Sequence, residues 1–197
     1  MKTEYQAIAQ SSFTLQVDCP DLAMSRHTLY KDKTLAEFRK IAAMHVEALN
    51  HALTGISPEQ VRIHLCWGNY EGPHHHDGAL CDIIDIFLQA NVGAISYEAA
   101  NPRHEHEWEV FAEVKLPAGK ALIPGVIDSV SNFIEHPELI AQRLCRVAEL
   151  VGRENVLAGT DCGFGTAGTS RVDTEIAWAK LGAMVEGARI ASQRLWR

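Results

Sequence analysis

The chain has 197 residues, 47% of them hydrophobic, which is enough to form the core of one domain of ordinary size. Its net charge of −7 and isoelectric point near 5.8 argue against nucleic acid or an anionic membrane as partner, because both bind clustered Lys and Arg. No apolar run approaches the roughly 18 residues of a membrane span, and the N-terminus lacks the apolar core of a secretory signal. Five cysteines without a tight spacing pattern do not indicate a disulfide framework, so we expect the reducing cytoplasm, and we expect a single domain over residues 1–197.

Short apolar runs alternate along the chain with longer segments whose apolar residues recur at spacings of three and four, as in amphipathic helices. In chain order the pattern predicts strand 13–17, helix 35–53, strand 61–66, helix 80–88, strand 93–97, strand 121–127, helix 139–150, strand 156–159 and helix 174–195. Gly152 is the expected C-cap of the third helix, and the last helix is expected to begin after Ser170 and Asp173.

Strands that alternate with helices predict parallel βα units, and therefore the α/β class. Two architectures remain open on this pattern, an open doubly wound sheet and part of a (β/α)8 barrel. No GxGxxG motif follows the first strand, which disfavours the nucleotide-binding form of the open sheet.

Each predicted strand ends in a side chain that can bind a metal or a proton. In α/β barrels the carboxyl ends of the strands form the active site, so this regularity predicts a functional site there. The residues, in chain order, are Asp18, His64 and Cys66, Glu98, Asp128, and Asp161 with Cys162.

Three of these side chains, His64, Cys66 and Cys162, form a donor set of the kind that binds zinc. Glu98 ends its strand at the matching level and could complete a tetrahedron. The alternative is that the cysteines only fill the core, since free cysteine is among the most buried residue types. We interpret the other cysteines, Cys19, Cys81 and Cys145, in that way.

Four segments give the sequence a resemblance to a known family: QVDCP around Asp18, HLCWGNYEGPHHHD, YEAANPRHEHEW and AGTDCGFGT. The chain resembles the C-terminal catalytic part of the cobalamin-independent methionine synthases, and most of all the short branch that includes the epoxyalkane:coenzyme M transferases. The resemblance implies a (β/α)8 TIM-barrel fold, present here as its C-terminal part of about five βα units. It also implies a zinc ion (Zn2+) bound by His64, Cys66, Glu98 and Cys162.

The function that the resemblance implies is zinc-dependent transfer of a methyl or other alkyl group to a small thiol, as in methionine biosynthesis by 5-methyltetrahydropteroyltriglutamate–homocysteine methyltransferases. Asp18 matches the position that holds the amino group of homocysteine in the family, and capping of the following loop is the alternative role for it. Asp128, at the end of the fourth strand, is the second candidate catalytic residue. Val130 is a departure, because it stands where the methionine synthases carry a histidine that donates a proton.

Three alternatives stay open: a non-catalytic zinc-binding half-barrel, an epoxide:thiol transferase, and a metal-independent lyase on the related uroporphyrinogen decarboxylase-like barrel. The two cysteines among the zinc ligands disfavour the lyase. Because five strands cannot close an eight-stranded barrel, we expect a homo-oligomer or a separate N-terminal half-barrel chain as partner. His74, His75 and His76 follow the turn signal Gly72-Pro73, and we expect a loop that is either solvated or a lid over the metal.

Overall fold

The computed structural model describes residues 1–165 and 172–197, so the predicted helix signal at Ser170 lies outside the described residues. The chain divides into two compact units, and each is described separately below. Unit 1 consists of Met1–Trp67, His75–Ile95 and Leu116–Lys120. Unit 2 consists of Gly68–His74, Ser96–Lys115 and Ala121–Arg197.

The strands follow one another in sequence order in a sheet ordered β1-β2-β3-β4-β5. Their bounds are β1 Leu15–Asp18, β2 Val61–Leu65, β3 Ala94–Tyr97, β4 Ala121–Ile127 and β5 Gly159–Thr160. In unit 1, β1 pairs with β2 in parallel, and in unit 2, β4 pairs with β5 in parallel. Parallel neighbours need a crossover connection, and the helices between the strands supply it, which confirms the predicted α/β class.

The long helix of unit 1, α2 (Leu35–Ala52), forms where the apolar stripe predicted it. Thr34 caps it in a capping box: its hydroxyl accepts a bond from the Glu37 amide at 3.2 Å, and the Glu37 carboxylate accepts one from the Thr34 amide at 2.8 Å. Phe38, Ala42 and Val46 lie on the buried face at spacings of four, so the helix covers one side of unit 1 with a single apolar stripe.

Two predictions for unit 1 were wrong in detail, and one helix was not predicted. The segment 80–88 is not one helix: it forms a 3-10 turn, Leu80–Asp82, and a one-turn helix, α3 (Ile84–Phe87), because the backbone of Ile83 leaves the helical region at φ −136°. The first strand begins at Leu15, since Phe13 is 67% exposed. The N-terminal helix α1 (Lys2–Gln10) was missed because it buries no residue and therefore carries no apolar stripe.

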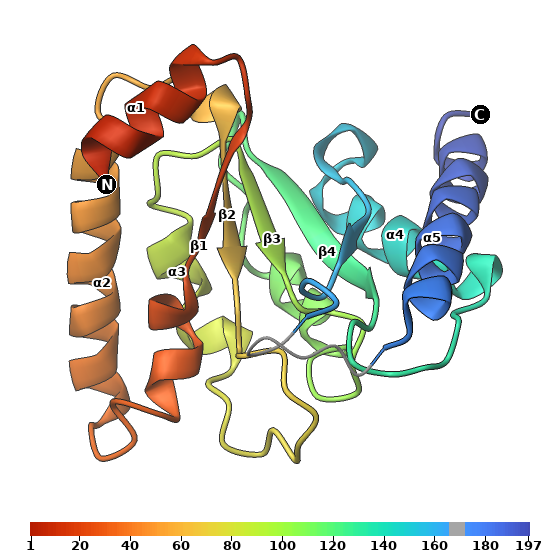
Figure 1. Ribbon diagram of the computed structural model, residues 1–197, viewed down its shortest axis with the longest axis horizontal. Helices are drawn as coiled ribbons and strands as arrows, with labels where there is room; N and C mark the ends of the chain where they lie inside the picture. Colours follow the sequence, from red (N-terminus) through yellow and green to blue (C-terminus); the bar gives the residue numbers. More distant parts are fainter. Residues whose placement is uncertain (166–171) are drawn as a thin grey trace. The chain divides into compact units, whose positions relative to one another are not determined.

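The two helices of unit 2, α4 (Pro137–Val151) and α5 (Thr174–Leu195), pack side by side (Figure 1). Their close approach needs Gly187, where a Cβ atom would lie 2.8 Å from the carbonyl oxygen of Pro137. The predicted caps are confirmed: α4 ends at Gly152 with φ 91°, and the Asp173 side chain accepts a bond from the Glu175 amide at the start of α5. The buried core between these helices and β4 consists of Val126, Ile127, Ile140, Ala141, Leu144 and Ala191.

The fifth strand is shorter and later than predicted. Val156 makes only an isolated bridge to Leu122, and the paired strand is Gly159–Thr160. The register of β4 against β5 shifts between Gly125 and Ile127, which interrupts the ladder and shortens the strand. The shift places the end of β5 directly before Asp161 and Cys162.

Short 3-10 helices occupy several of the connections. They are Pro20–Leu22, Met24–Arg26, Pro58–Gln60, Leu80–Asp82, Glu107–Ala112 and Arg153–Asn155. Over the described part of the chain, none of the helices has both the length and the apolar character that crossing a membrane requires.

Candidate metal centre

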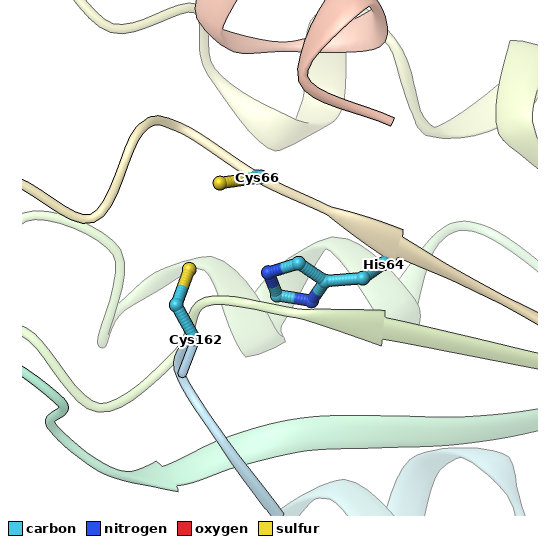
Figure 2. Close-up of side chains that lie close together, drawn as sticks. All are labelled: His64, Cys66 and Cys162. Atoms are coloured by element: carbon cyan, nitrogen blue, oxygen red, sulfur yellow. The ribbon is translucent and has the colours of Figure 1, made fainter. Parts of the chain in front are cut away.

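The first pair of predicted ligands belongs to unit 1 and comes from one strand. His64 lies in β2 and Cys66 follows that strand directly, and both side chains are buried, with 7% and 8% of their surface exposed. Side chains two residues apart in extended chain project to the same face, so the strand itself aims the imidazole and the thiol in one direction. Figure 2 shows both at the end of β2, and it also labels Cys162, which follows β5.

Asp18, the predicted catalytic residue of unit 1, ends β1 and stands opposite His64 in the parallel register. Burial raises the pKa of its carboxyl group above the ordinary value, the nearby Cys66 raises it further, and His64 lowers it. The structure therefore brings Asp18 together with the first ligand pair, at the carboxyl end of neighbouring strands.

The second pair belongs to unit 2 and comes from two loops. Glu98 follows β3 and Cys162 follows β5, and the Cys162 thiol donates to Oε1 of Glu98 at 3.4 Å. Both residues are buried, with 2% and 7% exposed. A buried carboxyl group and a buried thiol are both acids. When both are ionised their negative charges repel each other, and a cation bound between them removes that repulsion.

A buried polar network holds the loop that carries Glu98. Asp161, which is 2% exposed, accepts hydrogen bonds from the backbone amides of Ala99, Ala100 and Asn101 at 2.8–2.9 Å. The Asn101 side-chain amide donates to Oδ2 of Asp161 and to Oε2 of Glu98, both at 3.0 Å. Burial raises the pKa of Asp161, and the amide donors act against this by stabilising its charged form.

Asp161 can reach this loop because β4 carries a glycine beside it. A Cβ atom at Gly125 would lie 2.7 Å from the Cα and 2.8 Å from the amide nitrogen of Asp161, closer than real side chains come. The glycine therefore permits the close approach of the two backbones at the point where the β4–β5 register shifts.

Cys162 is held by a second network. Its backbone amide donates to the Ser129 hydroxyl at 3.1 Å, and that hydroxyl donates to Oδ1 of Asn69 at 2.7 Å. The Asn69 amide group in turn donates to the carbonyl of Gly163 at 2.6 Å. Asn69 has a positive φ of 47°, which asparagine tolerates better than most residues. Sequence reasoning missed Asn69, Ser129 and Asn101, since their role depends on contacts between distant segments.

Unit 2 contains a cavity of about 210 Å³ beside Glu98. Asp128, the second predicted catalytic residue, lines it together with Val130, His74 and Arg103. The Asp128 carboxylate accepts a bond from the Val130 amide at 2.9 Å. The structure thus places the candidate ligand Glu98 and the candidate catalytic Asp128 on one cavity, which is large enough for a small substrate or part of one.

The three consecutive histidines differ in their surroundings. His74 has a positive φ of 51°, its ring stacks on Tyr70 with centroids 4.1 Å apart, and its Nε2 lies 2.7 Å from the carbonyl oxygen of Tyr70. His75 and His76 are exposed. The segment is a loop, as predicted; His74 belongs to the wall of the cavity, and the other two fit the solvated interpretation.

The cysteines outside the predicted ligand set agree with core filling only in part. Cys19 is buried and Cys145 packs half-buried against the core of unit 2. Cys81 is exposed, so its prediction was wrong. The cause is the failed helix 80–88: without a continuous helix, the position does not share the apolar face of its neighbours.

Comparison with known proteins assigns the chain to a family. Residues 2–190 match the family described as "Cobalamin-independent synthase, Catalytic domain". A 2-hydroxypropyl-CoM lyase from Xanthobacter autotrophicus is 26% identical over 76% of this chain and 45% of its own length. A methionine synthase from Thermococcus kodakarensis is 28% identical over 77% of this chain and 39% of its own.

The fold has an experimental counterpart in a B12-independent methionine synthase from Shewanella sp. W3-18-1, with a TM-score of 0.71 at 20% identity. That match covers 99% of this chain and 53% of the Shewanella chain, so this sequence spans about half the length of the proteins it matches. The likeness confirms the predicted partial TIM-barrel fold. With its family model matched over nearly all of its residues, the chain belongs to the cobalamin-independent synthase catalytic-domain family.

Proposed function

We propose that this chain binds zinc through His64, Cys66, Glu98 and Cys162 and serves the transfer of an alkyl group to the sulfur of a small thiol. The observation that carries the proposal is the donor chemistry: one imidazole, two thiols and one carboxyl, all buried and all at strand ends. Sulfur and nitrogen donors of this kind select zinc. Membership of a family that includes methionine synthases supports the same reaction class.

The ligand set also indicates which chemistry the metal would support. Two thiolates and a carboxylate carry more negative charge than a zinc ion neutralises, so the centre is electron-rich. When bound there, zinc lowers the pKa of a substrate thiol and keeps its sulfur nucleophilic at neutral pH. In the overall exchange the sulfur of the thiol bonds to the alkyl carbon, the bond from that carbon to the donor atom breaks with its electrons left on the donor atom, and the proton of the thiol ends on that donor atom.

The remaining roles fall to residues near the ligands. We propose that Asp18, which stands opposite His64, binds a polar group of the thiol substrate such as an amino group. We propose that Asp128 orients the substrate in the cavity that it shares with Glu98. Methyl transfer from a folate to homocysteine is the first candidate reaction, by likeness to the named methionine synthases.

A second candidate reaction is the joining of a thiol to an epoxide, or its reverse. It is favoured by Val130, which lines the cavity of unit 2 and offers no proton donor there, and by the likeness to the 2-hydroxypropyl-CoM lyase. The two candidates are separated by mass spectrometry of products. Homocysteine with a methylated pteroylglutamate tests the first, and 2-mercaptoethanesulfonate with epoxypropane tests the second.

The metal proposal is tested by elemental analysis and X-ray absorption on the purified chain. We expect one zinc per chain with two sulfur neighbours at about 2.3 Å and two nitrogen or oxygen neighbours at about 2.0–2.1 Å. Addition of the thiol should add a sulfur. A chain without zinc, or a Cys162→Ser variant that keeps the full zinc content and the same spectrum, would contradict the proposal.

We further propose that a second copy of this chain or a separate half-barrel chain contributes to the active assembly. The basis is that the matched relatives are about twice as long as the region they share with this chain. Light scattering gives the mass of the purified chain in solution. A monomer that turns over a thiol at full rate without another protein would contradict this part of the proposal.

A further inference from the structure

We propose that Asn101 and Asp161 are positioning residues that fix Glu98 so that Oε1 alone is presented as a metal-binding oxygen. This inference rests on the proposed zinc site and concerns Asn101, which sequence reasoning missed, and Asp161, for which it gave no role beyond its place at a strand end. Every contact that carries it lies within unit 2.

The orientation of the Asn101 side chain is determined by its hydrogen bonds. Its Oδ1 accepts from the backbone amides of Arg103 and His104, at 3.1 and 3.2 Å. Its Nδ2 faces two carboxylates, those of Glu98 and Asp161. An amide nitrogen carries two hydrogens and an amide oxygen carries none, so only this orientation satisfies all four contacts.

The hydrogen bond from Asn101 therefore gives the two oxygens of Glu98 different roles. Oε2 accepts the bond from Nδ2 at 3.0 Å, whereas Oε1 is the oxygen that lies 3.4 Å from the Cys162 sulfur. A carboxylate with one oxygen engaged in this way is held against rotation about its last side-chain bond. Oε1 is thus the oxygen that lies beside the thiol of the second candidate ligand, which predicts a single metal–oxygen bond from Glu98.

Asp161 fixes the backbone beneath this arrangement. Its two oxygens accept four hydrogen bonds. Three come from the consecutive backbone amides after Glu98, and the fourth comes from the side-chain amide of Asn101. Asp161 directly precedes Cys162 in the chain. The residue that hydrogen-bonds the loop after Glu98 therefore also fixes the backbone from which Cys162 follows. One buried carboxylate thereby sets the spacing of two ligands that are 64 residues apart in the chain.

Asp161 is also linked to Glu98 through one hydrogen-bonding group, since both carboxylates accept a hydrogen bond from the Asn101 side-chain amide. Partners of this kind that orient metal ligands commonly change metal affinity by about 10- to 100-fold when they are removed.

The test compares zinc affinity, measured by competition with a chromophoric chelator, in four chains: the unaltered chain, Asn101→Asp, Asp161→Asn and Asn155→Ala. Asn101→Asp keeps the oxygen that accepts from Arg103 and His104 but places a carboxylate oxygen against Glu98 and Asp161. Asn155→Ala is the control, because Asn155 is a half-buried asparagine of unit 2 whose side-chain amide donates to the Val151 carbonyl at the end of α4. We expect losses of about 10- to 100-fold for the first two variants and less than twofold for the control.

Each outcome decides the inference. If the unaltered chain binds zinc and both variants bind it equally well, the positioning role is overturned while the zinc site stands. If Asn155→Ala loses as much affinity as Asn101→Asp, the effect is one of general stability and the positioning role is again overturned. If the unaltered chain binds no zinc, this inference and the proposed function fail together.

A measurement on the unaltered chain tests the inference even when the variants do not fold. X-ray absorption of the zinc-loaded protein counts the light-atom neighbours of the metal. A monodentate Glu98 and one imidazole give two of them beside two sulfurs, whereas a carboxylate bound through both oxygens gives a third. A third light neighbour assigned to the Glu98 carboxylate would overturn the inference without any substitution.

Discussion

The two units of the molecule position their ligands in different ways. In unit 1, His64 and Cys66 lie two residues apart at the end of one strand, and the alternation of side chains along extended backbone is enough to aim both. In unit 2, Glu98 and Cys162 come from separate loops, and they meet through Asp161, Asn101 and Ser129.

The difference indicates where the candidate site is vulnerable. A ligand pair that depends on strand geometry is disturbed only by changes to the strand or to the ligands. A pair that depends on a buried polar network is disturbed by any change that breaks the network, including changes at residues that touch neither ligand. Unit 2 should therefore be the more sensitive half of the site, and the following variants test that contrast.

The largest effect is expected from removing a ligand sulfur in either unit. Cys66→Ser and Cys162→Ser should each lower zinc affinity by more than about 100-fold, which is the upper range for the loss of a supporting residue alone. Zinc content after dialysis against a chelator measures this. Cys81→Ser is the control, since that thiol is exposed; equal zinc retention in all three variants would show that neither sulfur binds the metal.

The next largest effect should come from Gly125→Ala, which contacts no ligand. The added methyl group would collide with the backbone of Asp161, and we expect a loss of about 1–3 kcal/mol in the free energy of unfolding together with roughly tenfold weaker zinc binding. Thermal and chemical denaturation measure the first quantity and chelator competition the second.

Gly182→Ala is the matched control for this variant. A Cβ atom at Gly182 meets nothing within 4 Å, and alanine inside helix α5 should stabilise it by about 1 kcal/mol. If Gly125→Ala is as stable as Gly182→Ala, the close approach at Asp161 does not constrain the loop.

A smaller effect is expected from Ser129→Ala, compared with Ser25→Ala in unit 1. Both serines are buried, at 2% and 3% exposed, and each loss of a hydroxyl bond should cost about 1 kcal/mol of stability. Only Ser129 bonds the backbone of a candidate ligand, so only that variant should also weaken zinc binding, by a few-fold. Parallel losses of zinc affinity in both variants would remove the contrast between the units.

The smallest effect concerns a cysteine of unit 1 outside the ligand set. Burial, together with the nearby Asp21 and Asp18, raises the pKa of Cys19 to about 12, so at pH 8 its thiolate fraction is on the order of one in ten thousand. We expect iodoacetamide to modify the exposed Cys81 first and Cys19 last, as followed by peptide mass spectrometry. Because the thiolate is the reactive form, the rate at Cys19 should rise steadily with pH; early modification at pH 8 would contradict its burial.

How well the sequence predicts each helix or strand depends on how many residues its hydrophobic pattern covers. The stripes of α2, α4 and α5 repeat over several turns, so local pattern placed these helices within a few residues. Segment 80–88 was wrong because its stripe is short, and a single non-helical residue, Ile83, divides it. Helix α1 has no buried face, so periodicity gave no signal for it.

The candidate site shows the same limit. His64 and Cys66 follow from the strand and its alternation, and the observation that each strand ends in a polar residue pointed to Asp18, Glu98, Asp128 and Cys162. Asn101, Ser129 and Asn69 could not be found in that way, since each acts through partners 33 to 94 residues distant, or through a backbone turn, that only the folded chain brings together. The assignment of the four ligands to one zinc stays a prediction.

One buried charge has a consequence for any attempt to shorten or fuse this chain. Lys180, fully buried in α5, pairs with Oε2 of Glu135 at 2.8 Å, while Oε1 of the same carboxylate accepts from the Asp128 amide at 2.8 Å. The last helix is thus linked through the Glu135 carboxylate to the backbone amide of Asp128, which lines the cavity of unit 2. Deleting that helix would leave the Glu135 carboxylate without its lysine partner, so an expressed fragment should keep α5 through Leu195.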